Sequence, residues 1–169
     1  MQKIKIDFQK AFSKGKKPHS SLFKRWAAGT IAYLEQHPDH QHVLQHRPVV
    51  EFSVRFVEAE ESERLNGHYH HENKPTNVLA FPFNEPEVLD LTHQYLLGDL
   101  VLCVSKIEKE AEAYGYAATR ATHEYWAHIF IHGLLHLFQF QHDNPEHQQQ
   151  MEAVEIAILA TLGYSNPYA

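Results

Sequence analysis

Three histidines that lie close together in the sequence are the residues of this chain most suited to chemistry. His132, His136 and His142 are spaced by four and six residues in the apolar stretch "HGLLHLFQFQH". Residues four apart on a helix share one face, so His132 and His136 can direct ring nitrogens to one ion, as zinc requires. His142 can complete the set only where the chain leaves the helix and turns back. The spacing therefore predicts one zinc ion held by these three histidines.

Three protein ligands leave one of the four zinc positions open, which is typical of catalytic rather than structural zinc. Water in that position loses a proton near neutral pH, so hydrolysis is the reaction that such a site favours. In the alternative interpretation, the three histidines are buried and hydrogen-bonded without a metal. We disfavour it, because burying three imidazoles without partners is unfavourable, whereas one metal ion satisfies all three.

The other histidines are less suited to this role. His128 is also four residues from His132, but it lies two turns, or about 12 Å, from His136, so the three cannot share one ion. We expect His123 and His128 to pack or to hydrogen-bond around the site. A polar loop holds a second group, formed by His37, His40, His42 and His46. No rigid element fixes that loop, so we expect exposed turn histidines there rather than a metal site.

Four strands and four or five helices must position these residues. Alternating or apolar runs predict strands over residues 4–9, 49–57, 74–83 and 96–104. Pro82 cannot donate to a sheet, so the third strand is expected at an edge, with its unpaired side facing a cleft. The elements do not alternate regularly between strand and helix. The sequence therefore predicts an α+β fold with a mixed sheet of about four strands, in one domain over residues 1–169.

Local signals predict where the helices begin and end. Ser20 or Ser21 can cap the first helix, which ends at His37 before a proline. A short acidic helix after the second strand is expected to end near the Asn66-Gly67 turn signal. Ser105 and Glu108 form a capping box for the next helix, which Gly115 interrupts.

The last two helices carry the histidines and the end of the chain. One, from about Ala117, is apolar on nearly every face and is expected to be central and buried. Gly133 within it costs about 1 kcal/mol relative to alanine, which indicates a close approach to the helix backbone. Pro145 suits the first turn of the last helix, and Gly163 can close it. That helix has an apolar stripe formed by Met151, Val154, Ile158 and Leu162.

Composition narrows the class of protein. The chain has 169 residues, 43% of them hydrophobic, without the run of roughly 18 apolar residues that a membrane span needs. The N-terminus has no apolar stretch of the signal-peptide type, so we expect a soluble, cytoplasmic protein with no membrane partner. Cys103 is the single cysteine, which excludes an internal disulfide and favours a small core residue with no disulfide-linked partner.

Charge is distributed unevenly along the chain. The net charge of −6 argues against a wholly basic nucleic-acid module. Eight of the fifteen basic residues nevertheless lie in the first 25 positions, and they are Lys3, Lys5, Lys10, Lys14, Lys16, Lys17, Lys24 and Arg25. Such a patch could contact a phosphate backbone, or it could be a solvated face that keeps the protein in solution. The sequence leaves both interpretations open.

Several segments resemble one known family. The stretch "HGLLHLFQFQH" resembles the H-G-x-L-H-L-x-G-x-D-H signature of the YbeY-type endoribonucleases, zinc-dependent bacterial enzymes of ribosomal RNA maturation and ribosome quality control. "LNGHYHHENKPTNVLAFPF", "LLGDLVLCV" and "EAVEIAILATLGYSNPY" resemble other segments of that family, and the likeness covers roughly residues 48–164. The resemblance implies a single-strand-specific endoribonuclease that matures the 3′ end of 16S rRNA. It also implies ribosomal particles as partners, and His132, His136 and His142 as ligands of one zinc ion.

Three residues depart from the family pattern. Two of them lie within this signature, and the third is at a position that the family links to activity. Gln139 replaces a glycine, so we expect it in a left-handed turn at some conformational cost. Gln141 replaces the aspartate before the third histidine, which removes a candidate proton acceptor beside the metal. His70 stands where the family has an arginine linked to activity on RNA, so a permanent cation is replaced by a group that is mostly neutral at pH 7.

Two other functions compete with the nuclease. A zinc protease needs a glutamate after the first histidine, and Gly133 occupies that position here. A zinc-stabilised RNA or ribosome assembly factor without catalysis is the second alternative, which the three departures favour.

Overall fold

A four-stranded sheet and five α-helices make up the protein, as seen in a computed structural model that describes residues 3–44, 48–83, 96–116 and 119–169. The strands are β1 (Lys3–Ala11), β2 (Val49–Val57), β3 (Val78–Pro82) and β4 (Leu96–Cys103). The helices are α1 (Ser20–Gln36), α2 (Ala59–His70), α3 (Val104–Ala113), α4 (Thr119–Leu137) and α5 (Pro145–Thr161), with one short 3-10 turn at Gln41–Leu44.

The sheet is mixed, with the strand order β1-β2-β4-β3. β1 and β2 are parallel, as are β2 and β4, whereas β3 runs antiparallel to β4. The predicted α+β class is therefore confirmed. β3 lies at an edge of the sheet, as Pro82 in its last position predicts. Gly98 of β4 pairs with Pro82, and any side chain there would overlap the carbonyl oxygen of Phe81.

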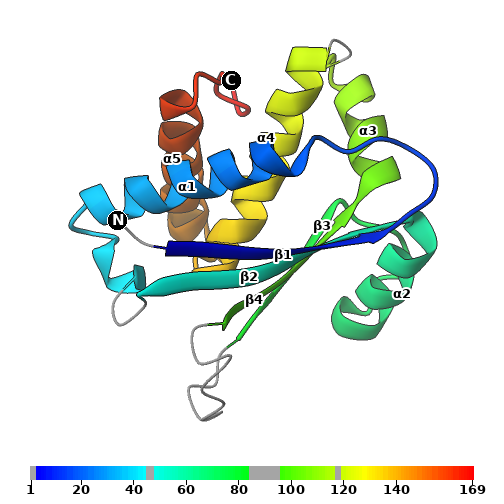
Figure 1. The fold of residues 1–169 in the computed structure, drawn as a ribbon, viewed down its shortest axis with the longest axis horizontal. Helices are drawn as coiled ribbons and strands as arrows, with labels where there is room; N and C mark the ends of the chain where they lie inside the picture. The colour runs from blue at the N-terminus through cyan, green and yellow to red at the C-terminus, as the bar shows by residue number, and fades with distance from the viewer. Residues whose placement is uncertain (1–2, 45–47, 84–95, 117–118) are drawn as a thin grey trace.

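Helices cover both faces of the sheet (Figure 1). α2 lies on one face over a small buried cluster, while α1, α4 and α5 cover the other and enclose the main core. β2 alternates accordingly, with Phe52, Val54 and Phe56 fully buried on the α4 side. Trp126 and Phe130 of α4 are also fully buried, so α4 is the central buried helix that its sequence predicts.

Gly133 lets α4 lie unusually close to the sheet. A Cβ atom at this position would be 2.8 Å from Val78 Cγ2 and 3.0 Å from a methyl group of Leu100. These side chains come from β3 and β4. The predicted close approach to the helix backbone is therefore confirmed, and it brings α4 beside the edge strand.

The start of α1 differs from the prediction, whereas its end does not. His19, rather than Ser20 or Ser21, is the N-cap residue, because its Nδ1 accepts the backbone N–H of Ser21 at 3.1 Å. An imidazole nitrogen here takes the role that a serine hydroxyl usually has. The helix ends at Gln36, directly before His37, as expected.

The predicted end of α2 is wrong. The helix continues past the Asn66-Gly67 signal to His70, and His71 then adopts a left-handed conformation with φ of 58°. The reason is that Asn66 is buried and its side-chain amide donates to the carbonyl of Lys74 at 2.9 Å. Asn66 therefore ties the helix to the following loop instead of ending it.

The predicted capping box of α3 is also wrong. Cys103 precedes the helix as its N-cap residue, and it is buried as expected. Glu108 does not reach back to Ser105. Its carboxylate accepts the backbone N–H of Lys16 at 2.6 Å, so it fixes the segment between β1 and α1. Local capping is replaced here by a long-range contact.

The predicted start of α4 and the predicted ends of α5 agree better with the structure. Ala117 lies outside the described residues, and α4 begins at Thr119. α5 begins with Pro145 after Asn144, whose side chain accepts the N–H of His147, and the chain leaves it through Gly163 with φ of 85°. Among the helices that the structure describes, none combines the length and hydropathy needed to cross a bilayer.

Candidate metal centre

The three predicted ligands come from the end of α4 and the segment that follows it. His132 and His136 lie on one face of the last turns of α4, and His142 returns to them after the helix ends. The reversal takes place at Gln139, which has φ of 73°. The expected left-handed turn is therefore confirmed at this residue. The N–H of Phe140 then bonds to the carbonyl of Leu135 at 3.0 Å and closes the helix.

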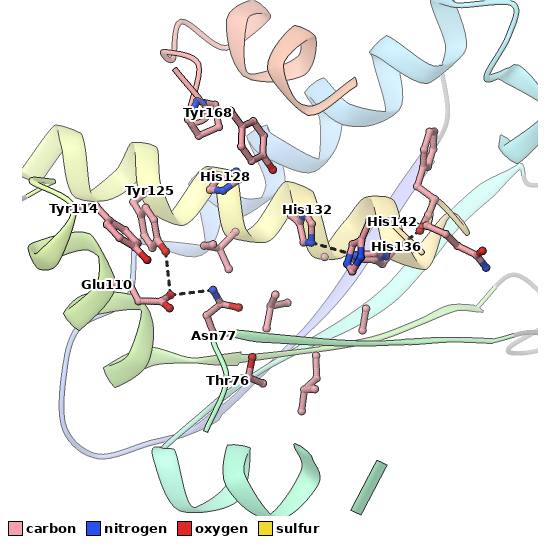
Figure 2. A pocket seen from close by; sticks show the side chains of 18 of the residues that line it. Thr76, Asn77, Glu110, Tyr114, Tyr125, His128, His132, His136, His142 and Tyr168 are labelled. Carbon is pink, nitrogen blue, oxygen red and sulfur yellow. Dashed lines mark hydrogen bonds between the residues drawn. The ribbon is translucent and has the colours of Figure 1, made fainter. Parts of the chain in front are cut away.

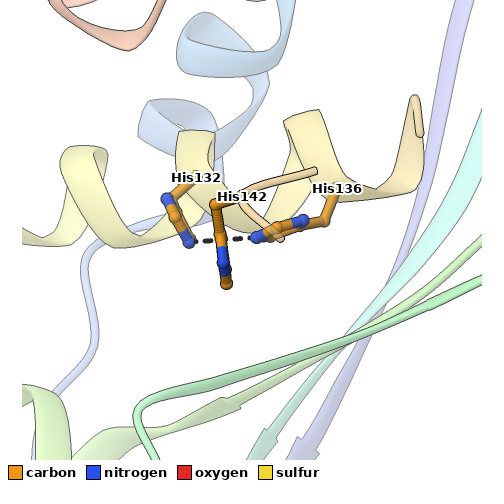
Figure 3. Close-up of side chains that lie close together, drawn as sticks. All are labelled: His132, His136 and His142. Atoms are coloured by element: carbon orange, nitrogen blue, oxygen red, sulfur yellow. Dashed lines mark hydrogen bonds between the residues drawn. The ribbon is translucent and has the colours of Figure 1, made fainter. Parts of the chain in front are cut away.

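The three side chains, which we call the three-histidine group, converge on one point (Figure 3). One nitrogen atom from each ring lies within 4.8 Å of the others, so the group could hold a metal ion. His132 Nε2 and His136 Nε2 are 3.1 Å apart. Two nitrogens bound to one tetrahedral zinc ion are separated by about 3.3 Å, so this pair already has a suitable spacing.

The second nitrogen of each helical ring has an acceptor of its own. His136 Nδ1 lies 2.9 Å from the carbonyl oxygen of Phe140, and His132 Nδ1 contacts a carboxylate oxygen of Glu155. These acceptors require the proton of each neutral ring to be on Nδ1. No proton then lies between the two Nε2 atoms, whose lone pairs face a common position. This arrangement fits a cation between the rings.

The protonation of His136 also suits a metal ligand. Burial and the neighbouring His132 lower the pKa of His136 to about 4, although its bond to the Phe140 carbonyl opposes the shift. The ring is therefore neutral at pH 7. Only a neutral imidazole can bind a metal, so no proton has to be removed from His136 at this pH.

Glu155 of α5 supports the site and was missed by the sequence prediction. Its carboxylate is fully buried, contacts His132, and accepts the hydroxyl of Tyr168 at 2.5 Å. Burial raises the pKa of Glu155, but contacts with His128 and His132 and the Tyr168 bond outweigh burial and lower it to about 2. The sequence contains a feature that could have identified Glu155, because this residue lies on the apolar stripe of the last helix, between Met151 and Ile158. A single carboxylate on a buried stripe indicates a partner in the core.

The other histidines remain outside the three-histidine group. His128 Nδ1 is 3.5 Å from Glu155 and has no hydrogen bond of good geometry, so His128 lies around the site as expected. His123 is half-buried. In the loop, His46 lies outside the described residues, and the histidines at 37, 40 and 42 form no group that could hold a metal within the described chain.

The three-histidine group opens into a cleft of about 960 Å³ beside β3 (Figure 2). His70, Gln139 and Gln141 also line this cleft, so all three departures from the family pattern lie there. Its described lining contains no lysine or arginine. Nor does any of the eight basic residues of the first 25 positions line it. The exposed Lys3 and Lys5 lie on β1, at the opposite edge of the sheet.

Fold and site together define a small α+β protein with a three-histidine group that could hold a metal ion, in a cleft beside an edge strand. Residues 12–163 match the family described as Endoribonuclease YbeY. The chain belongs to this family of endoribonucleases, which are enzymes of the hydrolase class.

Individual relatives support this assignment over nearly the whole chain. An Endoribonuclease YbeY from Colwellia psychrerythraea is 39% identical over 163 residues, covering 96% of each chain. Another from Idiomarina loihiensis is 38% identical over 168 residues, covering 99% of this chain and 93% of the relative. The solution structure of TM1509 from Thermotoga maritima has a TM-score of 0.54 at 19% identity and covers 95% of this chain and 91% of its own. That likeness supports the fold alone.

Proposed function

We propose that this endoribonuclease depends on one zinc ion held by His132, His136 and His142, and that it cleaves single-stranded RNA. The observation that carries the proposal is the convergence of the imidazole nitrogens within 4.8 Å of one another, with the other nitrogens of both helical rings engaged by acceptors. Three imidazoles suit zinc and leave one position for a reactant. When bound, zinc would act as a Lewis acid and supply a nucleophile at neutral pH.

Residues of this chain would keep the ligands in the required orientation. Glu155 and the Phe140 carbonyl hold the Nδ1 protons of the two helical rings, so each ring can present only Nε2 to the ion. His142 is exposed and comes from outside the helix, so it would be the ligand nearest to solvent. Gln141 cannot act as a base where the family has an aspartate, so the proton acceptor for the reaction has to come from elsewhere.

The cleft supports a preference for unpaired RNA. Four tyrosines line it, at positions 114, 116, 125 and 168, and no lysine or arginine does so among the described lining residues. Recognition of a duplex relies on phosphate and 2′-hydroxyl contacts, whereas unpaired bases stack on aromatic rings. His70 is exposed at the end of α2 and lines the cleft, so it is the residue that we propose to contact phosphate.

The biological substrate that we propose is the 3′ end of 16S rRNA, with a role in ribosome quality control in the cytoplasm. The support is the resemblance of the segments around residues 65–83, 96–104 and 152–168 to the YbeY-type enzymes. Cells that lack the protein should accumulate 16S precursors with extended 3′ ends, and the parental gene should reverse this. Family membership favours an enzyme over the non-catalytic assembly factor.

The experiment that tests the proposal compares chelated, zinc-reloaded and untreated protein on one RNA, offered as a single strand and as a duplex. We expect about one zinc per chain, cleavage of the single strand only, loss of cleavage after chelation, and recovery with zinc. Full activity in chelated protein of verified metal content would overturn the zinc assignment. Equal cleavage of both RNA forms would overturn the strand preference.

A further inference from the structure

A second polar cluster lies at the far end of the cleft from the three-histidine group (Figure 2). It joins three elements, because Asn77 directly precedes β3, Glu110 belongs to α3 and Tyr125 to α4. The Asn77 side-chain amide donates to Glu110 Oε1 at 2.9 Å, and the Tyr125 hydroxyl donates to the same oxygen at 3.0 Å. All three residues line the cleft.

This pattern leaves one carboxylate oxygen of Glu110 for a ligand. Both donors bond to Oε1, and no donor among the described residues bonds to Oε2. Glu110 is half-buried and faces the cleft, so Oε2 is an acceptor with a fixed position. A carboxylate held in this way prefers a ligand that presents N–H groups.

Aromatic rings surround this acceptor. Tyr114 and Tyr116 lie 5.9 Å and 5.3 Å from Tyr125, measured between ring centroids. Tyr114 is 66% exposed although it is a large aromatic side chain. Exposed aromatic rings beside a nuclease cleft are suited to stacking with an unpaired base. The end of the cleft thus combines a stacking surface with a hydrogen-bond acceptor.

We propose that Asn77, Glu110, Tyr114 and Tyr125 form a subsite that binds one nucleobase of the substrate and selects a base with an exocyclic amino group. The inference rests on the proposed cleavage of single-stranded RNA in the same cleft. Cytosine presents an amino group where uracil presents a carbonyl oxygen, and a glutamate accepts a hydrogen bond from the first and repels the second. The subsite therefore favours cytosine over uracil, and adenine over hypoxanthine.

The position of the selected base follows from α4. Tyr125 lies nine residues before the midpoint between His132 and His136, which corresponds to about 13 Å along the helix axis. Stacked nucleotides rise about 3.4 Å each, so the base lies within about four nucleotides of the cleaved bond. Glu110 is accordingly a specificity residue and has no contact with the reacting atoms.

The cluster could instead serve only to join α3, α4 and the start of β3. A purely structural role predicts lower stability when the cluster is changed, with every RNA affected equally. Selection of a base predicts a change that depends on the nucleotide at one position. Base preference therefore distinguishes the two roles.

The first measurement uses the parental protein. Single-stranded RNAs that differ only by cytosine or uracil at each of the four positions on either side of the cleaved bond are compared by kcat/KM. We expect one position at which cytosine is preferred by about tenfold, and adenine over inosine to a similar degree. Preferences below about twofold at every position would overturn the proposal.

The second measurement uses Glu110→Gln, with Glu112→Gln as the matched control on an exposed part of α3 outside the cleft. Glutamine can present an N–H to the uracil carbonyl, so the preference for cytosine should disappear or invert. The control should keep it. A Glu110→Gln protein of parental melting temperature that retains the preference would overturn the proposal, and so would one that loses activity on all RNAs equally.

Binding separates this inference from the proposed catalysis. The same oligonucleotides are titrated into chelated protein, where metal-dependent cleavage cannot contribute, and the RNA is checked to be intact after each titration. A cytosine preference in binding supports the subsite even if the zinc assignment fails. Equal binding of all the oligonucleotides, together with equal cleavage rates, overturns the subsite while zinc-dependent cleavage remains intact.

Discussion

The described chain holds two groups of histidines that are close in sequence, and only one of them forms a candidate metal site. The three-histidine group places its nitrogens within 4.8 Å of one another. The loop histidines, which are those at 37, 40 and 42, form no such group within the described chain. His37 stacks on Tyr33 at 3.8 Å between centroids and bonds to its carbonyl, while His40 lies 5.4 Å from the ring of Phe140. The rings of His37 and His40 are thus held by aromatic neighbours.

The difference shows what a site needs beyond histidines that are close in sequence. Both groups have a ring nitrogen bonded to a carbonyl oxygen of the chain, as at His37 and His136. Only the helical pair shares one face of a rigid element, and only there does a reverse turn bring a third ring back. Substitutions in the two groups should therefore have very different effects.

The largest effect is expected for His136→Ala. Removal of a proposed ligand from the three-histidine group should abolish zinc binding and reduce cleavage to background. His40→Ala is the matched control and should change neither. Metal content by elemental analysis and cleavage of single-stranded RNA measure both variants. Zinc retained at one ion per chain in His136→Ala would remove the basis for distinguishing the two groups.

Glu155→Gln should have the next largest effect. Glutamine is similar in size, but it lacks the charge that holds the His132 proton. Changing such a partner lowers metal affinity by about 10- to 100-fold. Glu152→Gln, one turn away on α5 and partly exposed, is the control. Competition with a chromogenic chelator measures the affinity, and equal values for the two variants would show that Glu155 does not orient the site.

Acid should destabilise the metal-free protein through His136. Its folded pKa of about 4 lies below the ordinary value of 6.5, so the unfolded chain binds this proton more readily. The contribution to stability is complete above about pH 6.5 and is lost as the pH falls toward about 4. Discounted for solvent screening, the loss is about 1 to 2 kcal/mol. Urea unfolding of chelated protein at several pH values measures the free energy of unfolding as a function of pH. His136→Gln should weaken this pH dependence, and an unchanged pH dependence would contradict the lowered pKa of His136.

His70→Arg should raise RNA affinity several-fold at about pH 8, where histidine is neutral and arginine is charged. Histidine as a residue type carries a charge only at lower pH, so the gain should be smaller near about pH 6.5. His68→Arg adds the same charge to an exposed part of α2 that does not line the cleft. Binding at one fixed salt concentration compares the two. Equal gains would indicate a general charge effect, with the phosphate contacts elsewhere, such as on the basic residues of the first 25 positions.

The smallest effect is expected for Gln139→Gly. A side chain at φ of 73° is strained, so glycine should stabilise the protein by up to about 1 kcal/mol with zinc retained. Gln141→Gly, where φ is not positive, should give no gain. Thermal unfolding measures both. A lower melting temperature for Gln139→Gly would mean that the Gln139 side chain has a stabilising role of its own.

The sequence predicted those parts of the structure that depend on periodicity. β2 has the predicted bounds, β3 lies at an edge because of Pro82, and α4 is the buried helix. Two of the errors, at the end of α2 and the start of α3, lie where a side chain that suits a local turn or cap bonds to another segment instead. Glu108 bonds to the Lys16 backbone and Asn66 to that of Lys74, and no local pattern shows such pairs.

In the candidate site, too, the features set by local sequence could be predicted, and the contacts between distant segments could not. The spacing of the three histidines and the turn at Gln139 could be predicted, because both are local. Glu155 belongs to a different helix from His132, and Tyr168 follows that helix, so the contacts of Glu155 with both residues depend on how α5 packs on α4. The single carboxylate on an apolar stripe indicated that Glu155 has a partner in the core, but the sequence did not show which residue that partner is.

The contact at Gly133 also limits how this protein can evolve. A glutamate there is what a zinc protease with the same histidine spacing requires. Its Cβ atom alone would lie 2.8 Å from Val78 Cγ2 and 3.0 Å from a methyl group of Leu100, so these side chains would have to shift to admit it. The exchange would therefore disturb the core between α4 and the two strands beside the cleft. This packing cost separates the two chemistries.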